Sequence, residues 1–293
     1  MKKHMTRRSA LGQLAGATAA VGTLGAGFGQ ARAAEGNAPL KGRINHSVCK
    51  WCYGKIELDE FCAAAKNIGL KSVELLEVGD FDKVKKHGLV CAMVSGVPGG
   101  ITDGLNRESN HDRIVAFYEK TAPIVAEAGF KNIICFSGNR AGMSNEEGLD
   151  QCAKGLKRIV PVCEKHGVTA VMELLNSKVN HADYMCDLTE WGVKLCEKVG
   201  SERFKLLYDI YHMQIMEGDI IATIRKHHKW IAHYHTGGVP GRNEIDESQE
   251  LYYPAIMRAI VDTGFKGYVA QEFVPKRSDV LASLRQGVQI CDG

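Results

Sequence analysis

The segment LDQCAKGLKRIVPVCEKHGVTAVMELL, residues 149–175, contains the unit that recurs along the chain. Its first part is amphipathic, because apolar residues recur at the spacing of one helical face: Leu149, Cys152, Leu156, Ile159 and Cys163. Gly167 then supplies the residue without a Cβ that commonly ends a helix. The stretch 169–175 is apolar and contains an acid, Glu173, near its end. The segment therefore predicts a helix followed by a buried strand.

The same alternation returns from Arg43 onward. Eight apolar runs are expected to form strands: 43–49, 72–77, 90–95, 132–137, 169–175, 204–211, 231–236 and 267–273. Glycines that would end the preceding helices stand before many of them: Gly69, Gly88, Gly129, Gly167, Gly200 and Gly264. Strands that alternate with helices imply parallel pairing through crossover helices. Eight such units predict an α/β fold, a single (β/α)₈ TIM barrel.

An open, doubly wound sheet is the alternative arrangement of these elements. Such sheets usually carry a Gly-rich turn after the first strand, whereas here the first strand ends in Cys49-Lys50-Trp51-Cys52-Tyr53. Gly96-Val97-Pro98-Gly99-Gly100 follows the third run without the Lys-Ser/Thr of a phosphate-binding loop. We expect it to form a mobile loop near the barrel mouth.

The charge of the chain excludes a role based on a basic surface. The sequence has 37 Lys and Arg against 34 Asp and Glu, a formal net charge of +3. Five of the basic residues lie within residues 1–33, which contain no acid, so the rest has 32 basic and 34 acidic residues, a net of −2. A nucleic-acid-binding domain needs a positive excess. We therefore expect no nucleic-acid partner and, once residues 1–33 are removed, no membrane partner.

Residues 1–33 have the features of an export signal. A basic start, an Ala- and Gly-rich run at 10–29 and the small-residue site Ala31-Arg32-Ala33 are typical of a cleaved precursor. Thr6-Arg7-Arg8-Ser9-Ala10-Leu11 resembles the twin-arginine motif. A membrane anchor is the alternative, although glycines make this run a poor spanning helix. We expect a twin-arginine signal peptide at 1–33, a lead-in at 34–42, a barrel at 43–293 and a periplasmic location.

The ten cysteines are expected to be mostly buried and free. Most lie at apolar positions of predicted strands or helices, where free Cys behaves as a small hydrophobe. A chain of this length can bury a large core without disulfides. The one close pair, Cys49 and Cys52, lacks the second pair that a zinc knuckle needs, and a redox pair is the alternative.

Acidic or imidazole side chains stand at the ends of four consecutive predicted strands, where barrels of this kind have their active sites. These residues are Glu173, Asp209, His235 and Glu272. Two residues earlier, on the same face by strand alternation, stand Val171, Leu207, His233 and Ala270. Carboxylates and an imidazole in a barrel mouth are costly unless a divalent cation, or Lys and Arg at the rim, compensates them. The four residues predict one metal ion, Mn²⁺ or Mg²⁺, with Zn²⁺ or Co²⁺ as alternatives.

The segment that begins at Asp209 resembles a motif of a known family. Asp209-Ile210-Tyr211-His212-Met213-Gln214, followed by Met216-Glu217-Gly218, resembles the sixth-strand motif of the hydroxypyruvate isomerase family of xylose isomerase-like TIM barrels. The resemblance covers about residues 43–293 and places Glu173 and Glu272 at that family's two catalytic positions. It implies an isomerase that moves a proton between adjacent carbons of a small hydroxy-carbonyl compound or sugar through an enediolate. His235 is a departure, because some hydroxypyruvate isomerases have Gln there and ketose 3-epimerases have His.

Three further residues are candidates for substrate binding. His212 lies where the strand of Asp209 gives way to a loop, and we expect it to hydrogen-bond a substrate oxygen or to stand behind the ligands. The resemblance implies that Arg242 contacts the substrate and that Glu244 orients His212 or Arg242; a solvated loop pair is the alternative. Trp51 and Tyr53 would either form an apolar pocket wall or pack in the core.

Other functions remain open. A ketose 3-epimerase would use the same two glutamates on opposite faces of one carbon. A zinc-dependent AP endonuclease would need extra histidines where this chain has Glu74-Leu75-Leu76-Glu77 and Met93-Val94-Ser95. A non-catalytic periplasmic sugar-binding barrel would not need paired glutamates around a metal. A sugar or sugar derivative fits a periplasmic protein better than hydroxypyruvate, a cytoplasmic metabolite, and a homo-oligomer is compatible with the sequence.

Overall fold

The computed structural model describes residues 39–293. The expected signal peptide and most of the lead-in fall on residues 1–38 and therefore lie outside the described residues. Between residues 39 and 293, no helix is both long and apolar enough to cross a membrane.

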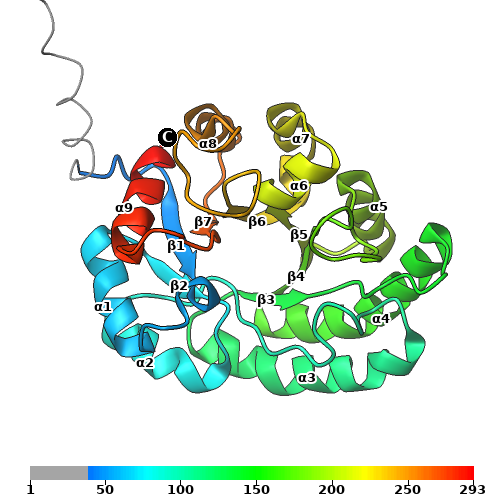
Figure 1. The fold of residues 1–293 in the computed structure, drawn as a ribbon. Coiled ribbons are helices and arrows are strands. Elements are labelled where there is room, and N and C mark those ends of the chain that lie inside the picture. The colour runs from blue at the N-terminus through cyan, green and yellow to red at the C-terminus, as the bar shows by residue number, and fades with distance from the viewer. Residues whose placement is uncertain (1–38) are drawn as a thin grey trace, which may run out of the picture. The chain divides into compact units, whose positions relative to one another are not determined.

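A curled parallel sheet runs through the described chain, with helices around its outer side (Figure 1). Seven strands pair in the order β2-β1-β7-β6-β5-β4-β3. Their bounds are β1 Asn45–Cys49, β2 Ser72–Glu74, β3 Asn132–Cys135, β4 Thr169–Glu173, β5 Phe204–Asp209, β6 Ile231–Thr236 and β7 Tyr268–Gln271. Every pairing between these neighbours is parallel. The predicted α/β barrel class is confirmed.

Segment 90–95 differs from the expected strand. Val90 and Val94 form only isolated parallel bridges to the segments on either side. The ladder is interrupted at Ala92, whose N–H donates to the Ser72 hydroxyl and whose C=O accepts from the side-chain amide of Asn132. Side chains thus satisfy the backbone groups that a continuous strand would pair. The segment still connects β2 to β3, so the sheet is bridged between its two edges.

Several helices end at the glycines that the sequence marks as helix-ending residues. Gly69, Gly167 and Gly200 follow α1, α4 and α5 with φ of 104°, 69° and 73°, the left-handed conformation that ends a helix. The helices are α1 Leu58–Ile68, α2 Phe81–Lys86, α3 Glu108–Glu127, α4 Asn145–His166, α5 Thr189–Val199, α6 Ile210–Met216, α7 Ile220–His227, α8 Tyr253–Asp262 and α9 Val280–Ile290. Short 3₁₀ helices span Lys50–Tyr53, Val78–Asp80 and His228–Trp230.

The apolar core has a large part and a small one. The large part includes the predicted apolar face of α4, the buried face of α1 and most of the cysteines. The small part is a separate cluster of Met93, Ile134, Val171 and Leu207. Val171 and Leu207 lie two residues before Glu173 and Asp209, so strand alternation carries these acids inward from the same apolar layer. All ten cysteines are free, and nine of them are buried.

Candidate active site

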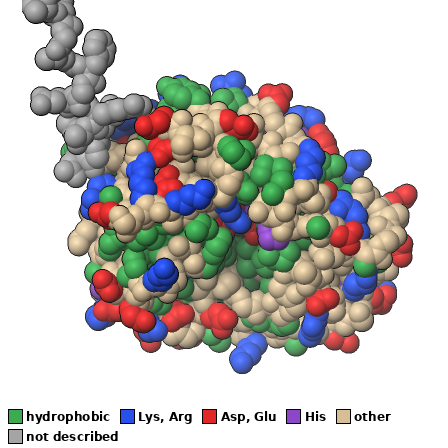
Figure 2. Space-filling model, viewed as in Figure 1, with side chains coloured by type: hydrophobic (Ala, Val, Ile, Leu, Met, Phe, Trp, Pro, Cys, Tyr) green, Lys and Arg blue, Asp and Glu red, His purple; other side chains and the backbone are tan. Residues whose placement is uncertain are grey.

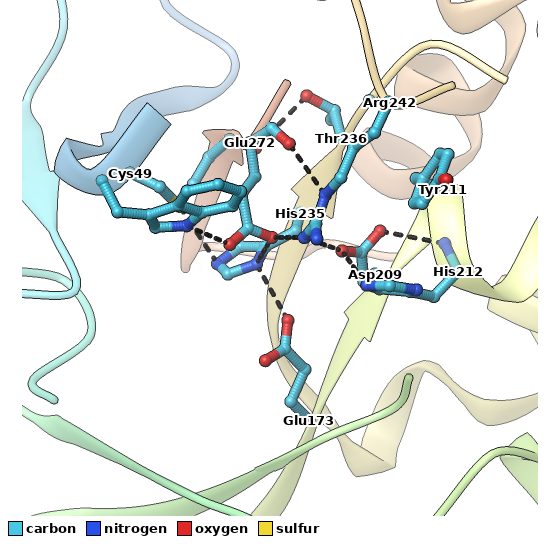
Figure 3. Close-up of polar contacts among 12 residues, drawn as sticks. Cys49, Glu173, Asp209, Tyr211, His212, His235, Thr236, Arg242 and Glu272 are labelled. Atoms are coloured by element: carbon cyan, nitrogen blue, oxygen red, sulfur yellow. Dashed lines mark hydrogen bonds and ion pairs between the residues drawn. The ribbon is translucent and has the colours of Figure 1, made fainter. Parts of the chain in front are cut away.

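Four ligand-type side chains converge at the carboxyl ends of neighbouring strands (Figure 3). Glu173 ends β4, Asp209 ends β5, His235 lies one residue before the end of β6, and Glu272 directly follows β7. One ligand atom from each lies within 4.8 Å of the others, and all four residues are buried. The structure thus brings together the four residues expected to form a metal centre.

Two atoms at the centre of this cluster make no well-aligned hydrogen bond to another described residue, although both are in ion-pair contact: Glu173 Oε1 and His235 Nδ1. His235 Nδ1 lies 3.3 Å from Glu173 Oε1 and 2.7 Å from Glu272 Oε2. Buried polar atoms are normally paired, and exceptions often mark the place of an ion or water. The orphaned atoms therefore face the point at which a cation would be held.

The charge of the cluster is only partly compensated. Arg242 Nη2 lies 3.2 Å from Asp209 Oδ2 and also bonds Glu272 Oε2. Two of the acids are therefore paired with an arginine, which is the alternative to a cation that the sequence leaves open. Three carboxylates and one guanidinium leave a net charge of −2. Burial alone would lower the pKa of His235, but Cys49 and Glu272 raise it well above its usual range, so a protonated imidazole offsets part of this charge while no metal is bound. Burial and the neighbouring Glu272 raise the pKa of Glu173, and burial raises the pKa of Asp209 to about 7. A divalent cation would supply the missing charge, and the oxygen-rich donor set suits it.

Behind His235 lies Glu74, the last residue of β2 and completely buried. Its Oε1 is 2.9 Å from His235 Nε2 and 2.8 Å from His233 Nε2, and its Oε2 accepts from the Ser47 hydroxyl. Burial alone would raise the pKa of Glu74, but His233 and His235 outweigh it and lower the pKa to about 2. The carboxylate therefore holds a proton on His235 Nε2 and leaves Nδ1 directed at the acids. Carboxylates commonly orient metal-binding histidines in this way.

Sequence reasoning missed this role of Glu74. The available signal was an acid at the end of a short buried run, the same pattern that identified Glu173 and Asp209.

His212 lies at the edge of the same cluster because α6 begins directly after β5. Asp209 caps α6, and its Oδ1 accepts the N–H of His212 at 3.2 Å. His212 Nδ1 accepts the backbone N–H of Asn176 at 3.2 Å and lies 2.6 Å from its side-chain amide. The proton is thereby assigned to Nε2, which has no hydrogen-bond partner in the described chain and lies 3.6 Å from Asp209 Oδ2. Burial and then Arg242 lower the pKa of His212, so the ring is neutral and presents one donor.

Arg242 is held over the site by two aromatic rings. Its guanidinium carbon lies 5.3 Å from the ring centre of Trp51 and 5.4 Å from that of Tyr211, distances typical of cation–π contacts. Trp51 is 48% exposed and donates its Nε1–H to Glu272 Oε1 at 2.7 Å, so it belongs to the pocket. Tyr53 instead packs in the core, stacked on Phe61.

Glu244 has a different set of partners from the expected one. Its Oε1 accepts the backbone N–H groups of Lys276 and Arg277 and the hydroxyl of Ser283. These contacts tie the loop after β6 to the segment before α9. They do not orient His212 or Arg242, and the reason is the direction of the loop, which the sequence does not reveal.

A cavity of about 380 Å³ opens beside the cluster. Glu173, Glu272, Arg242 and Trp51 line one part of it. The loop around Gly96 and Gly100 lines another part, as expected from its place after the third run. Figure 2 shows a hollow in this face of the molecule, with histidine, basic and hydrophobic side chains at its surface.

Comparisons with known proteins agree with this architecture. The chain is similar to 2-oxo-tetronate isomerase from Cupriavidus necator, 32% identical over 38% of this chain and 42% of that protein. It is 29% identical to hydroxypyruvate isomerase from Escherichia coli over 50% of this chain and 57% of that protein. It is 28% identical to D-psicose 3-epimerase from Ruminiclostridium cellulolyticum over 49% and 48% of the two chains. The chain thus spans about half the length of these curated relatives.

A solved structure extends the likeness to nearly the whole barrel. The crystal structure of an AP endonuclease of family 2 from Brucella melitensis superposes with a TM-score of 0.72, covers 84% of this chain and 97% of its own, and is 21% identical, which shows a shared fold. The sequence model of the family described as Xylose isomerase-like TIM barrel matches residues 62–290. Since that match includes all four converging ligand residues and nearly every strand, the chain belongs to the Xylose isomerase-like TIM barrel family.

Proposed function

We propose that the protein is a metal-dependent isomerase of the hydroxypyruvate isomerase type, acting on a small hydroxy-carbonyl compound or sugar. The observation that carries the proposal is the buried cluster of Glu173, Asp209, His235 and Glu272, whose ligand atoms meet beside a cavity. The relatives support it, because they are named as isomerases and an epimerase of small carbonyl compounds.

The same four residues would hold one divalent cation, Mn²⁺ or Mg²⁺, with Zn²⁺ or Co²⁺ as alternatives. When bound, such a cation supplies positive charge next to a carbonyl oxygen on which negative charge develops. His235 would contribute Nδ1, since Glu74 occupies its Nε2.

Glu173 is the group best placed to take a proton from a substrate carbon. Its Oε1 faces the point at which the cation would be held and the residue lines the cavity, so its other oxygen is the one left to accept a proton. Both oxygens of Glu272 are engaged, Oε1 by Trp51 and Oε2 by Arg242. We therefore assign the abstraction of the carbon-bound proton to Glu173 and the second acid/base role, at the neighbouring position, to Glu272.

His212 and Arg242 stabilise the negative charge that this proton transfer creates. His212 offers a neutral Nε2–H, a donor that can bond a substrate oxygen without leaving a charge unpaired when the site is empty. Arg242 stays protonated, because its pKa is raised by Glu272 and Asp209 in spite of burial. Donors fixed in advance near a developing oxyanion are a large source of rate enhancement.

The test is exchange of a substrate C–H proton with solvent deuterium in Mn²⁺-loaded protein. Glu173→Gln and Glu272→Gln keep the side-chain shape and one oxygen ligand but cannot cycle a proton. Each should retain metal and lose on the order of 10²–10⁴ in rate, and the losses should not add. The exposed Glu146→Gln on α4 is the control. Wild-type turnover in metal-loaded Gln variants would mean that the glutamates are only ligands.

A ketose 3-epimerase is the second candidate. It is favoured by His235 at the position where some hydroxypyruvate isomerases have Gln, and by the likeness to a D-psicose 3-epimerase. NMR analysis of the products from a panel of ketoses separates the two activities. An isomerase yields an aldose or hydroxy-aldehyde, whereas an epimerase yields only the ketose inverted at one carbon. A non-catalytic sugar-binding barrel would produce neither.

We also propose that the protein acts in the periplasm after twin-arginine export. The support is the sequence of residues 1–33, with Arg7-Arg8 and the site Ala31-Arg32-Ala33. Replacing Arg7-Arg8 by Lys-Lys should leave the precursor in the cytoplasmic fraction. Unchanged delivery to the periplasm by that variant would contradict twin-arginine export.

A further inference from the structure

The cavity beside the metal-type cluster has a second wall that the proposed proton transfer does not use. It is formed by side chains around the ends of β2, β3 and β4 and by the loop that follows residue 94: Leu75, Val97, Ile101, Ile134, Phe136 and Leu175. Ile134 also belongs to the small apolar cluster inside the barrel, and Leu75 and Phe136 pack against it. This wall is therefore continuous with the core.

The ionisable groups of the cavity lie on its other side, and Ser95 contributes one hydroxyl beside the second wall. Among the described residues that line it, Glu173, Glu272, His181 and Arg242 are the ones with ionisable side chains. Arg242 is the one permanent cation of that lining, and it is already paired with Asp209 and Glu272. A carboxylate or a row of hydroxyls placed against the second wall would meet Val97, Ile101 and Phe136, with the hydroxyl of Ser95 as the single polar side chain that this part of the lining offers.

The volume of the cavity points in the same direction. A space of about 380 Å³ is room for roughly a dozen groups of the size of water, at about 30 Å³ each. A three-carbon keto acid would fill about half of it. The remaining space lies beside apolar side chains, where burial of apolar surface is favourable and burial of unpaired hydroxyls is not.

We propose that the substrate carries an apolar group on the carbon chain beyond its hydroxy-carbonyl unit, and that this group lies against the wall of Val97, Ile101 and Phe136. The inference rests on the proposed function, since it places the reacting carbons beside Glu173 and Glu272. It names the substrate class as an alkyl- or aryl-bearing hydroxy-ketone or sugar derivative, and not a free polyol or a small keto acid.

The experiment uses 1-hydroxy-2-ketones that differ only in tail length: hydroxyacetone, 1-hydroxy-2-butanone and 1-hydroxy-2-hexanone. Binding to the Mn²⁺-loaded protein is measured by calorimetry, and exchange of the hydroxymethylene protons with solvent deuterium is followed by NMR. Each added methylene should tighten binding roughly 4-fold, or about 60-fold for the three methylenes between hydroxyacetone and 1-hydroxy-2-hexanone. The longer tails should also give a more negative heat-capacity change. Affinity that does not depend on tail length in the wild-type protein overturns the proposal.

Two variants place the effect on this wall. Ile101→Ser should remove most of the gain between hydroxyacetone and 1-hydroxy-2-hexanone and leave the affinity for hydroxyacetone nearly unchanged. Ile124→Ser is the matched control, because Ile124 is an exposed isoleucine on α3 outside the cavity. If Ile101→Ser does not fold, Ile101→Thr removes less apolar surface and should give a smaller loss in the same direction. An unchanged tail-length dependence in the folded variant shows that the tail binds elsewhere and overturns the assignment.

The two readouts separate this inference from the proposed function. Tail-dependent binding without any deuterium exchange supports the apolar subsite and contradicts the isomerase. Exchange at equal efficiency for all three ketones supports the proton transfer and contradicts the subsite.

Discussion

Replacing Glu74 by Gln tests whether the metal-type site depends on a residue that is not itself one of its ligands. Glu74 Oε1 accepts hydrogen bonds from both His233 and His235, at 2.8 and 2.9 Å, with all three side chains buried. Gln keeps the size and one carbonyl oxygen but removes the negative charge. Metal binding requires His235 to lose one proton, because its pKa is raised well above the usual range. Without the Glu74 charge the proton on Nε2 is held less firmly, and the competing neutral tautomer keeps its proton on Nδ1, the atom that would bind the metal.

The size of the effect follows from the two states of His235. A hydrogen bond to a charged acceptor contributes about 1.5–3 kcal/mol and one to a neutral acceptor about 0.5–1.5 kcal/mol, so Gln loses on the order of 1 kcal/mol of tautomer preference. The Nδ1–H tautomer gains in addition, because Glu272 Oε2 lies 2.7 Å from Nδ1 and accepts its proton. We expect Glu74→Gln to lower metal affinity about 10- to 100-fold, the range typical of residues that orient metal ligands.

Metal affinity is measured by competition between the protein and a chelator for Mn²⁺, and ¹⁵N NMR of the imidazoles reports the tautomer of His235 directly. Glu77→Gln is the matched control, a glutamate three residues further along that is exposed. Glu74→Gln protein that folds, binds Mn²⁺ as tightly as the wild type and keeps the Nε2–H tautomer would refute the reasoning.

Three further outcomes are expected. Asp209→Ala should lower metal content and thermal stability together, because a metal that binds only the folded state stabilises it; elemental analysis that shows unchanged metal would contradict this. In metal-free protein the folded-state pKa of Asp209 is about 7, above an unfolded value of about 3.9, so the folded state retains an extra proton between these values. Its contribution to the unfolding free energy is therefore full below about pH 4 and is lost as the pH rises towards 7; denaturant titrations should show a smaller slope in Asp209→Asn than in the wild type, where Glu173, whose pKa is also raised, adds to it, and Mn²⁺ should abolish the difference. A chain that begins at Glu35 should keep a cooperative thermal transition, since residues 1–33 lack the helix-face pattern of the later segments; loss of that transition in scanning calorimetry would count against the signal-peptide interpretation.

The positions of the four ligand residues could be predicted because they depend on local rules. Glu173 and Asp209 follow apolar residues at two-residue spacing, and strand alternation alone places them on the face of Val171 and Leu207. In a parallel sheet all strands end at the same edge, so acids at the ends of successive strands must come close together. Neither step requires knowledge of side-chain packing between distant segments.

The contacts of Glu74 and Glu244 could not be predicted in this way. Glu74 meets His233 and His235 only because β2 and β6, which lie three positions apart in the sheet, face each other inside the curled sheet. Glu244 points to Lys276 and Arg277 because of the path of a loop after β6 in which Arg242 adopts a left-handed φ of 58°. The interruption of the strand at Ala92 also depends on contacts between distant segments. The side chains of Ser72 and Asn132 form the hydrogen bonds with its backbone N–H and C=O that neighbouring strands would otherwise form.

The sequence by itself determined the order of strands and helices, the helix-ending glycines and the set of acids at the strand ends, because periodicity and backbone preference act over a few residues. Tertiary structure alone decided how the charge of those acids is shared with Arg242, which nitrogen of His235 faces Glu74, and which nitrogen of His212 carries the proton. It also decided that the cavity has ionisable groups on one wall and mostly apolar side chains on the other. These features depend on distances between side chains far apart in the chain, and hydrogen bonding and burial change steeply over such distances.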